Sequence, residues 1–181
     1  MFVAGFIGSS GSGKTTLIEA LLGEFARRGL RVSVIKHAHH GFELDREGKD
    51  SWRHRQAGAH EVLVASPHLL ALQRATREPR EYEIGELLAR LEQVDWVFVE
   101  GYKHASIARI EVWRASTGKP PSLPGEAGVL AVASDGQPPA NAAPGGARLD
   151  LARPAEVADW LIAHRERFAW QPPGPESAAS R

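Results

Sequence analysis

The chain has 181 residues, 43% of them hydrophobic, and its 22 basic and 22 acidic residues give a formal net charge of zero. That length suits one domain with a substantial core, and the balanced charge gives no support to a general role in binding nucleic acid or a membrane surface. The sequence contains no cysteine, which excludes disulfides and thiolate metal sites, and no apolar run approaches the roughly 20 residues of a membrane span. Because residue 1 leads straight into an apolar run without a signal peptide, we expect a cytoplasmic protein.

The first predicted elements are a strand over residues 2–7, a glycine-rich loop and a helix. Residues 8–15 read Gly-Ser-Ser-Gly-Ser-Gly-Lys-Thr and match the whole pattern G-x-x-x-x-G-K-[ST]; we call them the phosphate loop. Apolar residues at helical spacing follow, Gly29 is placed to end the helix, and a second apolar strand begins near residue 31. In this setting Lys14 is expected to reach the outer phosphates of a nucleotide and the Thr15 hydroxyl to coordinate Mg²⁺.

A polar stretch rich in His and Arg follows the second strand, over residues 36–60. We expect a loop to about Gly48 and a short helix over residues 51–57. The loop can bring single cations to an anionic partner, and the candidates are Lys36, Arg53 and Arg55.

Two kinds of site residue are candidates within that stretch. Asp45 is a candidate metal-side acid, with a capping or ion-pairing role as the alternative. Three histidines can hold a transition metal, lie beside a bound phosphate or be solvated at the surface, and the spacing leaves these alternatives open; they are His37, His39 and His40.

A β-hairpin is expected next. Residues 61–65 and 69–73 have the composition of two short strands, and Ser-Pro-His between them is typical of a turn. One face of a helix then follows in the apolar residues Ile84, Leu87, Leu88 and Leu91.

Glu100 ends the apolar strand predicted over residues 94–99. Ligands of parallel sheets bind at the carboxyl ends of the strands, so Glu100 is expected to face the metal or to orient an attacking water, with Gly101 allowing a close turn. A solvated strand-end acid is the alternative. Asp95 lies at the other end of that strand and is expected to be structural or solvated.

The remaining pattern predicts strands over residues 110–113 and 129–133 and a last helix beginning at Pro154. Residues 137–146, rich in Pro, Ala and Gly, are expected to be a connector. Strands that alternate with helices indicate an α/β fold of the P-loop NTPase type, a mostly parallel twisted sheet with helices on both faces. We expect one nucleotide-binding domain over residues 1–168 and a disordered tail rich in Pro, Ser and Ala over residues 169–181.

Asp135 follows the strand over residues 129–133 at Ala-Ser-Asp-Gly. A carboxylate there can accept two hydrogen bonds from guanine, at N1–H and the exocyclic amine, and adenine offers no such pair of donors. An ordinary Asp-Gly turn explains the residue equally well.

Several blocks taken together resemble the molybdopterin-guanine dinucleotide biosynthesis adapter family, often called MobB. The blocks are GSSGSGKTTL after the first strand, VIKHAHHGFELDREGKDSWRHRQAGA after the second, VFVEGYK at the acidic strand and AVASD near the end. They span most of residues 1–168. The first block is common to many nucleotide-binding proteins, and the second is much more specific.

The resemblance implies a GTP-binding protein with weak Mg²⁺-dependent GTPase activity, usually a homodimer. It implies an adapter beside the guanylyltransferase that joins molybdopterin to GMP, with molybdopterin itself or molybdoenzyme-maturation proteins as further partners. By position, Glu100 is the metal-side acid, the guanine contact falls near Asp135, and the residues that hold phosphates and Mg²⁺ are Gly11, Ser12, Gly13, Lys14, Thr15 and Thr16.

Other functions compete with this one. A small ATP-dependent kinase would share the loop and the sheet, with cations over the transferred phosphate drawn from Arg74, Arg77 and Arg80. A nickel-insertion GTPase would call for thiols or a long His tract, and a partition-type ATPase would have lysine where Ser9 stands. A scaffold that binds nucleotide without turnover also remains open.

Overall fold

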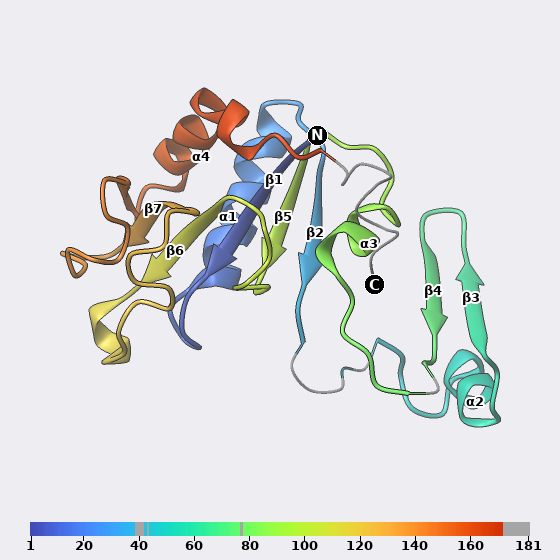
Figure 1. The fold of residues 1–181 in the computed structure, drawn as a ribbon. Helices are drawn as coiled ribbons and strands as arrows, with labels where there is room; N and C mark the ends of the chain where they lie inside the picture. The colour runs from blue at the N-terminus through green and yellow to red at the C-terminus, as the bar shows by residue number, and fades with distance from the viewer. Residues whose placement is uncertain (39–41, 43, 77, 172–181) are drawn as a thin grey trace. The chain divides into compact units, whose positions relative to one another are not determined.

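The computed structural model describes residues 1–38, 42, 44–76 and 78–171. These residues gather into two compact units (Figure 1). The sheet unit is Met1–His37 with the described part of Glu83–Arg181, and the hairpin unit is the described part of Ala38–Tyr82.

The sheet unit is built on six strands whose order is β2-β5-β1-β6-β7-β8, and each neighbouring pair is parallel. The predicted α/β class and mostly parallel sheet are therefore confirmed. The strands are β1 (Phe2–Ile7), β2 (Val32–Lys36), β5 (Trp96–Glu100), β6 (Arg109–Trp113), β7 (Val129–Ser134) and β8 (Ala147–Asp150).

One face of this sheet is covered by two long helices, α1 (Lys14–Arg27) and α4 (Pro154–Ala163) (Figure 1). The apolar stripe of α1 buries Leu17, Ile18, Leu21 and Phe25. Phe98 of β5 lies at the centre of this layer, with its ring centroid 5.1 Å from that of Phe25. Burial of each such side chain contributes about 1.5–3 kcal/mol, so this layer fixes the strands that carry the site.

The other face is covered in part by a short helix, α3 (Ile84–Leu88). Its Ile84 and Leu88 pack against Val97 and Val99 of β5. A capping box closes its first turn, with Glu83 and Glu86 each accepting from the other's backbone N–H.

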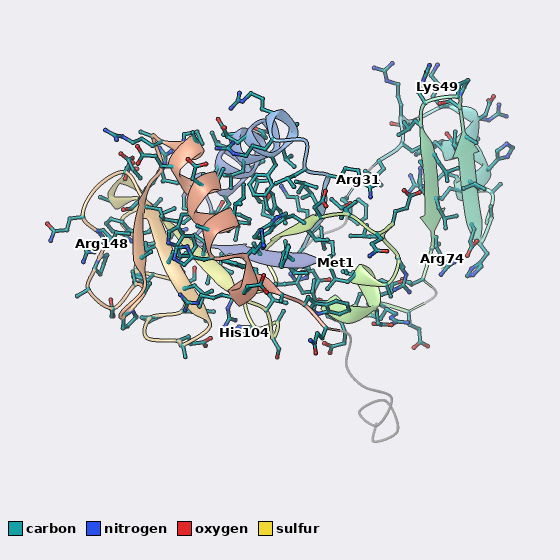
Figure 2. All side chains as sticks on the ribbon, turned by 90° about the horizontal axis from the view of Figure 1, so that it is seen from above. Met1, Arg31, Lys49, Arg74, His104 and Arg148 are labelled. Carbon is teal, nitrogen blue, oxygen red and sulfur yellow. The ribbon has the colours of Figure 1, made fainter. Side chains whose placement is uncertain are left out.

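The hairpin unit contains α2 (Asp50–Gln56) and the antiparallel strands β3 (Glu61–Ala65) and β4 (Leu70–Arg74). Ser66 closes the turn, since its N–H donates to the Leu69 carbonyl at 2.8 Å and its Oγ accepts from the Leu69 N–H at 3.0 Å. The predicted hairpin is thus present. Figure 2 shows the side chains of both units, with Arg74 labelled on β4.

Three differences from the sequence prediction stand out. Strand β8 was not predicted, because four residues of mixed polarity at a sheet edge carry little apolar signal. Helix α3 ends at Leu88, so that Leu91 lies beyond it. Ala169 and Trp170 lie past the predicted domain end at residue 168, yet the Trp170 N–H donates to the Met1 carbonyl at 3.3 Å and Ala169 forms a bridge with Phe2. Of the tail expected over 169–181, residues 172–181 fall outside the described residues.

In the part of the chain that the structure describes, no helix combines the length and apolar character that crossing a membrane requires.

Candidate functional site

The phosphate loop joins β1 to α1 at the centre of the sheet, and its backbone depends on glycine. Gly8, Gly11 and Gly13 all have positive φ. A Cβ at Gly8 would lie 2.3 Å from the Val112 carbonyl oxygen of β6, which no side chain tolerates. The loop therefore passes so close to β6 that only glycine fits at its first position.

Lys14 folds back over this loop. Its Nζ donates to the carbonyls of Gly8 and Ser9, each at 2.9 Å. Burial lowers the pKa of the Lys14 ammonium, while the nearby Glu100 carboxylate acts in the opposite direction. An ammonium has three donors, so two of them hold the lysine to the loop and a third can face an anion.

Glu100 and Thr15 meet at this edge of the sheet. The register pairs Phe6 of β1 with Glu100 of β5, and the Thr15 hydroxyl donates to Glu100 Oε1 at 3.0 Å. Lys36, which ends β2, places its Nζ 3.4 Å from the same oxygen. Parallel strands that end together thus bring an acid, a hydroxyl and a second lysine to the phosphate loop.

A hydroxyl and a carboxylate are hard oxygen donors of the kind that Mg²⁺ prefers, and this pair comes from the loop and from the neighbouring strand. The donor set therefore fits Mg²⁺, with Thr15 and Glu100 as the residues that would hold it.

His37 lies beside Glu100 but packs against a ring. The backbone N–H of His37 donates to the Glu100 carbonyl at 2.9 Å, and its imidazole stacks on the Tyr102 ring with centroids 4.6 Å apart. Gly101 makes this possible, because its φ is +93° and a Cβ there would lie 2.9 Å from the His37 Cβ. His39 and His40 lie outside the described residues, and within those residues no group of three His, Asp or Glu could hold a metal ion.

Asp45 belongs to the hairpin unit. Its Oδ1 accepts from the Ser51 hydroxyl at 2.9 Å and from the Arg46 N–H at 3.0 Å, while its Oδ2 is buried and has no hydrogen-bond partner among the described residues. The roles considered for Asp45, as a metal ligand or as a capping or ion-pairing residue, stay predictions.

Asp135 directly follows β7 and meets an arginine that the sequence did not single out. Arg114 Nη1 lies 3.7 Å from Asp135 Oδ2, and Arg114 Nε donates to the Ser12 carbonyl of the phosphate loop at 3.1 Å. A cavity of about 470 Å³ opens beside Asp135, lined by Ser134, Gly136, Gln137, Pro138, Arg148, Leu149 and Asp150. Asp135 therefore lines a cavity and is linked to the phosphate loop through Arg114. It is a candidate to contact the base of a bound nucleotide.

Sequence reasoning missed two charged residues near the loop, Arg114 and Glu111. Arg114 could have been found by the rule that found Glu100, since it is the residue that follows a strand of the sheet. Glu111 lies within β6, and no pattern marked it. Its side chain is buried, Oε1 accepts from the Ser122 N–H at 3.0 Å, and burial raises the pKa of its carboxyl.

The arginines considered for a kinase lie in the hairpin unit or outside the described residues. Arg74 forms an ion pair with Glu61 across the hairpin, and the Arg80 guanidinium lies 4.4 Å from the Tyr82 ring centroid. Arg77 lies outside the described residues. These contacts give Arg74 and Arg80 structural roles within the hairpin unit.

Comparison with known proteins gives a consistent result. The model of the family described as MobB, molybdopterin guanine dinucleotide synthesis protein B, matches residues 3–135. The molybdopterin-guanine dinucleotide biosynthesis adapter protein of Escherichia coli (strain K12) is 41% identical over 133 residues, which are 72% of this chain and 76% of that protein. The protein of the same name from Haemophilus influenzae is 42% identical over 134 residues, 72% of this chain and 73% of its own.

Among solved structures, the MobB protein homolog from Bacillus stearothermophilus superposes with a TM-score of 0.63 at 25% identity, covering 92% of this chain and 99% of its own.

Proposed function

This chain belongs to the MobB family, molybdopterin guanine dinucleotide synthesis protein B, and from that premise we propose that it is a GTP-binding adapter for the formation of molybdopterin guanine dinucleotide. It assists the guanylyltransferase that joins molybdopterin to GMP, and molybdopterin or molybdoenzyme-maturation proteins are its further partners. It acts in the cytoplasm. GTP is bound with Mg²⁺ and is hydrolysed slowly.

The observation that carries the proposal is the joint placement of Lys14, Thr15 and Glu100. The phosphate loop presents backbone N–H groups and the positive end of α1, a 14-residue helix, to an anion. Lys14 is held over the loop by two carbonyls, and Thr15 and Glu100 are 3.0 Å apart. A triphosphate with its Mg²⁺ matches this arrangement of one cation, one hydroxyl and one acid.

The roles of the chain's own residues in hydrolysis follow from that geometry. Lys14 neutralises charge on the outer phosphates, and Glu100 orients the attacking water or the metal's ligands, while Lys36 holds the Glu100 carboxylate from the side of β2. Mg²⁺ held by Thr15 and Glu100 would stabilise negative charge on the phosphates. We propose slow turnover because Arg114 is engaged by Ser12 and Asp135, and an arginine aimed at the transferred group contributes about 10³–10⁵ in rate.

Base selection is assigned to Asp135. Its carboxylate would accept from guanine N1–H and the exocyclic amine, in the hollow at the ends of β7 and β8. In Asp135→Asn one acceptor becomes a donor, so GTP should bind about 10–100-fold more weakly. Xanthosine triphosphate has a carbonyl in place of the amine, so the same variant should bind it more tightly than the wild type does.

The test is calorimetric titration of GTP and ATP with Mg²⁺, with and without the guanylyltransferase, together with measured GTP turnover. Tighter binding of GTP than ATP, with slow turnover, supports the proposal. Equal affinities, or an Asp135→Asn variant in which both nucleotides change alike, would refute guanine recognition. GTP binding with no turnover, alone or with the partner enzyme, would make the protein a nucleotide-binding scaffold.

A homodimer is also proposed, and the hairpin supplies the surface that supports it. Leu63, Ala65, Leu70 and Leu72 lie on one face of β3 and β4, and the three leucines are 52–68% exposed. We call these four residues the hairpin face. A two-stranded hairpin is marginal by itself, so an apolar face of this kind favours pairing with a second copy of the chain. The Glu61–Arg74 ion pair lies at the end of the hairpin face, so each copy of the chain has one acidic and one basic side chain there.

A further inference from the structure

Arg114 contacts two parts of the candidate site at once. It follows β6, and β6 lies between β1, which leads into the phosphate loop, and β7, which leads to Asp135. Neighbouring strands are about 4.8 Å apart, so the end of β6 falls between the loop and the acid. The sheet order alone therefore places this guanidinium between the two.

The contact with the phosphate loop is close and partly buried. Arg114 Nε donates to the Ser12 carbonyl at 3.1 Å, and Ser12 is fully buried. A Cβ at Gly13 would lie 3.1 Å from the same Nε, so the guanidinium packs directly on the loop backbone. The Arg114 carbonyl in turn accepts from the Thr117 hydroxyl at 2.8 Å, which fixes the main chain of the arginine.

The contact with Asp135 comes from another nitrogen of the same guanidinium. Arg114 Nη1 lies 3.7 Å from Asp135 Oδ2. A guanidinium is planar and presents its donors in a fixed fork, so fixing Nε on Ser12 also fixes where Nη1 lies. Each carboxylate oxygen has two lone pairs, so this ion pair leaves both oxygens of Asp135 able to accept hydrogen bonds from a base.

We propose that Arg114 is a positioning residue for base specificity, which holds the Asp135 carboxylate in place relative to the phosphate loop. The inference rests on the proposed binding of GTP. Arg114 acts through Asp135, and it contacts the loop at the Ser12 carbonyl. Lysine is a poor replacement, because one compact ammonium cannot reproduce the fixed fork that faces Ser12 and Asp135 together.

The experiment measures the ratio of the ATP and GTP dissociation constants, each with Mg²⁺, in the full-length protein. The variants are Arg114→Ala, Arg114→Lys, Asp135→Ala and the double variant Arg114→Ala/Asp135→Ala. Arg28→Ala is the matched control, because Arg28 bridges Glu24 and Asp159 at the far end of α1, about 20 Å of helix from the loop.

We expect Arg114→Ala to reduce the preference for GTP by about tenfold or more, to nearly the level of Asp135→Ala. The double variant should show no further loss of preference, and Arg114→Lys should also lose most of it. Arg28→Ala should keep the wild-type ratio.

The inference is overturned if Arg114→Ala and Arg114→Lys weaken GTP and ATP by the same factor, since Arg114 would then only support the loop. It is overturned equally if the preferences lost in the two single variants add in the double variant. A wild-type protein without preference for GTP would instead defeat the proposed guanine recognition, and that result appears before any variant is measured. Thermal unfolding of each variant identifies one that fails to fold, and Arg114→Lys then decides.

Discussion

The sheet unit and the hairpin unit bury their residues in opposite ways. Every buried residue among the described ones lies in the sheet unit, and within the described part of 38–82 each residue is half-buried or exposed. The sheet unit holds the phosphate loop in a close-packed frame, where small displacements are costly. The hairpin unit offers apolar side chains at its surface. The contrast fits the proposed function, in which the sheet unit holds the nucleotide and the hairpin unit meets a second copy of the chain.

The largest expected effect of a substitution lies in the core of the sheet unit. Phe98 is fully buried between Phe6 and Phe25, so Phe98→Ala should lower the free energy of unfolding by about 3–5 kcal/mol. Chemical denaturation of dilute, monomeric protein measures it. The control is Leu72→Ala on the hairpin face, which should cost about 0.5 kcal/mol or less. If the two variants lost the same free energy of unfolding, the hairpin face would be buried within one chain. The two units would then not differ in burial.

The second effect is a loss of nucleotide affinity that is expected in the sheet unit and not in the hairpin unit. Lys14→Ala removes the cation held by Gly8 and Ser9 and should weaken Mg²⁺–GTP binding by at least about 100-fold, or 2.7 kcal/mol. Lys49→Ala, in the hairpin unit, is the matched control and should keep the wild-type affinity in calorimetry. Retained micromolar affinity in Lys14→Ala would remove the phosphate-loop assignment. A loss in Lys49→Ala would place part of the nucleotide site in the hairpin unit.

The third effect concerns the hairpin face alone. Leu63→Asp puts a charge opposite Leu72 and should weaken self-association by about tenfold or more, because burying an unpaired charge is unfavourable. His68→Asp, in the turn between the strands, is the control. Analytical ultracentrifugation measures the association, and calorimetry should find unchanged GTP affinity. A wild-type chain that is monomeric at every concentration would contradict both the homodimer and the use of this face.

The smallest expected effect is a pH dependence inside the sheet unit. Burial raises the pKa of the Glu111 carboxyl above its ordinary value of 4.5, although the Ser122 backbone bond and the cations Lys103 and Lys14 oppose that shift. Between 4.5 and the raised pKa, the folded protein binds a proton that the unfolded chain has released. Stability should therefore fall as the pH rises through that window.

Glu111→Gln removes this component, so the difference in unfolding free energy between variant and wild type should grow in favour of the variant as the pH rises. Denaturation at a series of pH values checks it, with the exposed Glu92→Gln as control. A difference that is constant with pH would contradict the raised pKa.

Local patterns in the sequence predicted most of the sheet unit, because its strands are short apolar runs and its helices carry clear apolar stripes. The pairing of Thr15 with Glu100 could also be anticipated, since both follow from the rule that ligands bind where parallel strands end. Arg114 was different. It lies about one hundred residues from Ser12, and only the sheet order β1-β6-β7 brings them together.

Two other features had no local signal. Strand β8 is recognisable mainly from its pairing with β7, since its four residues alternate between half-buried and exposed at an edge. Glu111 is an acid where a buried strand is expected to be apolar, and its hydrogen-bond donor, Ser122, lies in a loop eleven residues later. The hairpin, in contrast, was predicted nearly residue by residue, because a turn and two short strands are local structures.

The central place of β1 in the sheet also determines how late in synthesis the sheet can form. Its neighbours are β5 and β6, so that Phe2 pairs with Trp96 and Ile7 with Glu111. A chain growing from its N-terminus completes the phosphate loop first and then adds roughly one hundred more residues, some 5–20 s of synthesis, before β1 has both partners. During that interval the apolar residues of β1 and α1 are candidates for chaperone binding. Under the proposed function, GTP would therefore bind only the finished fold, and it would stabilise the protein after assembly through mass action on the native state.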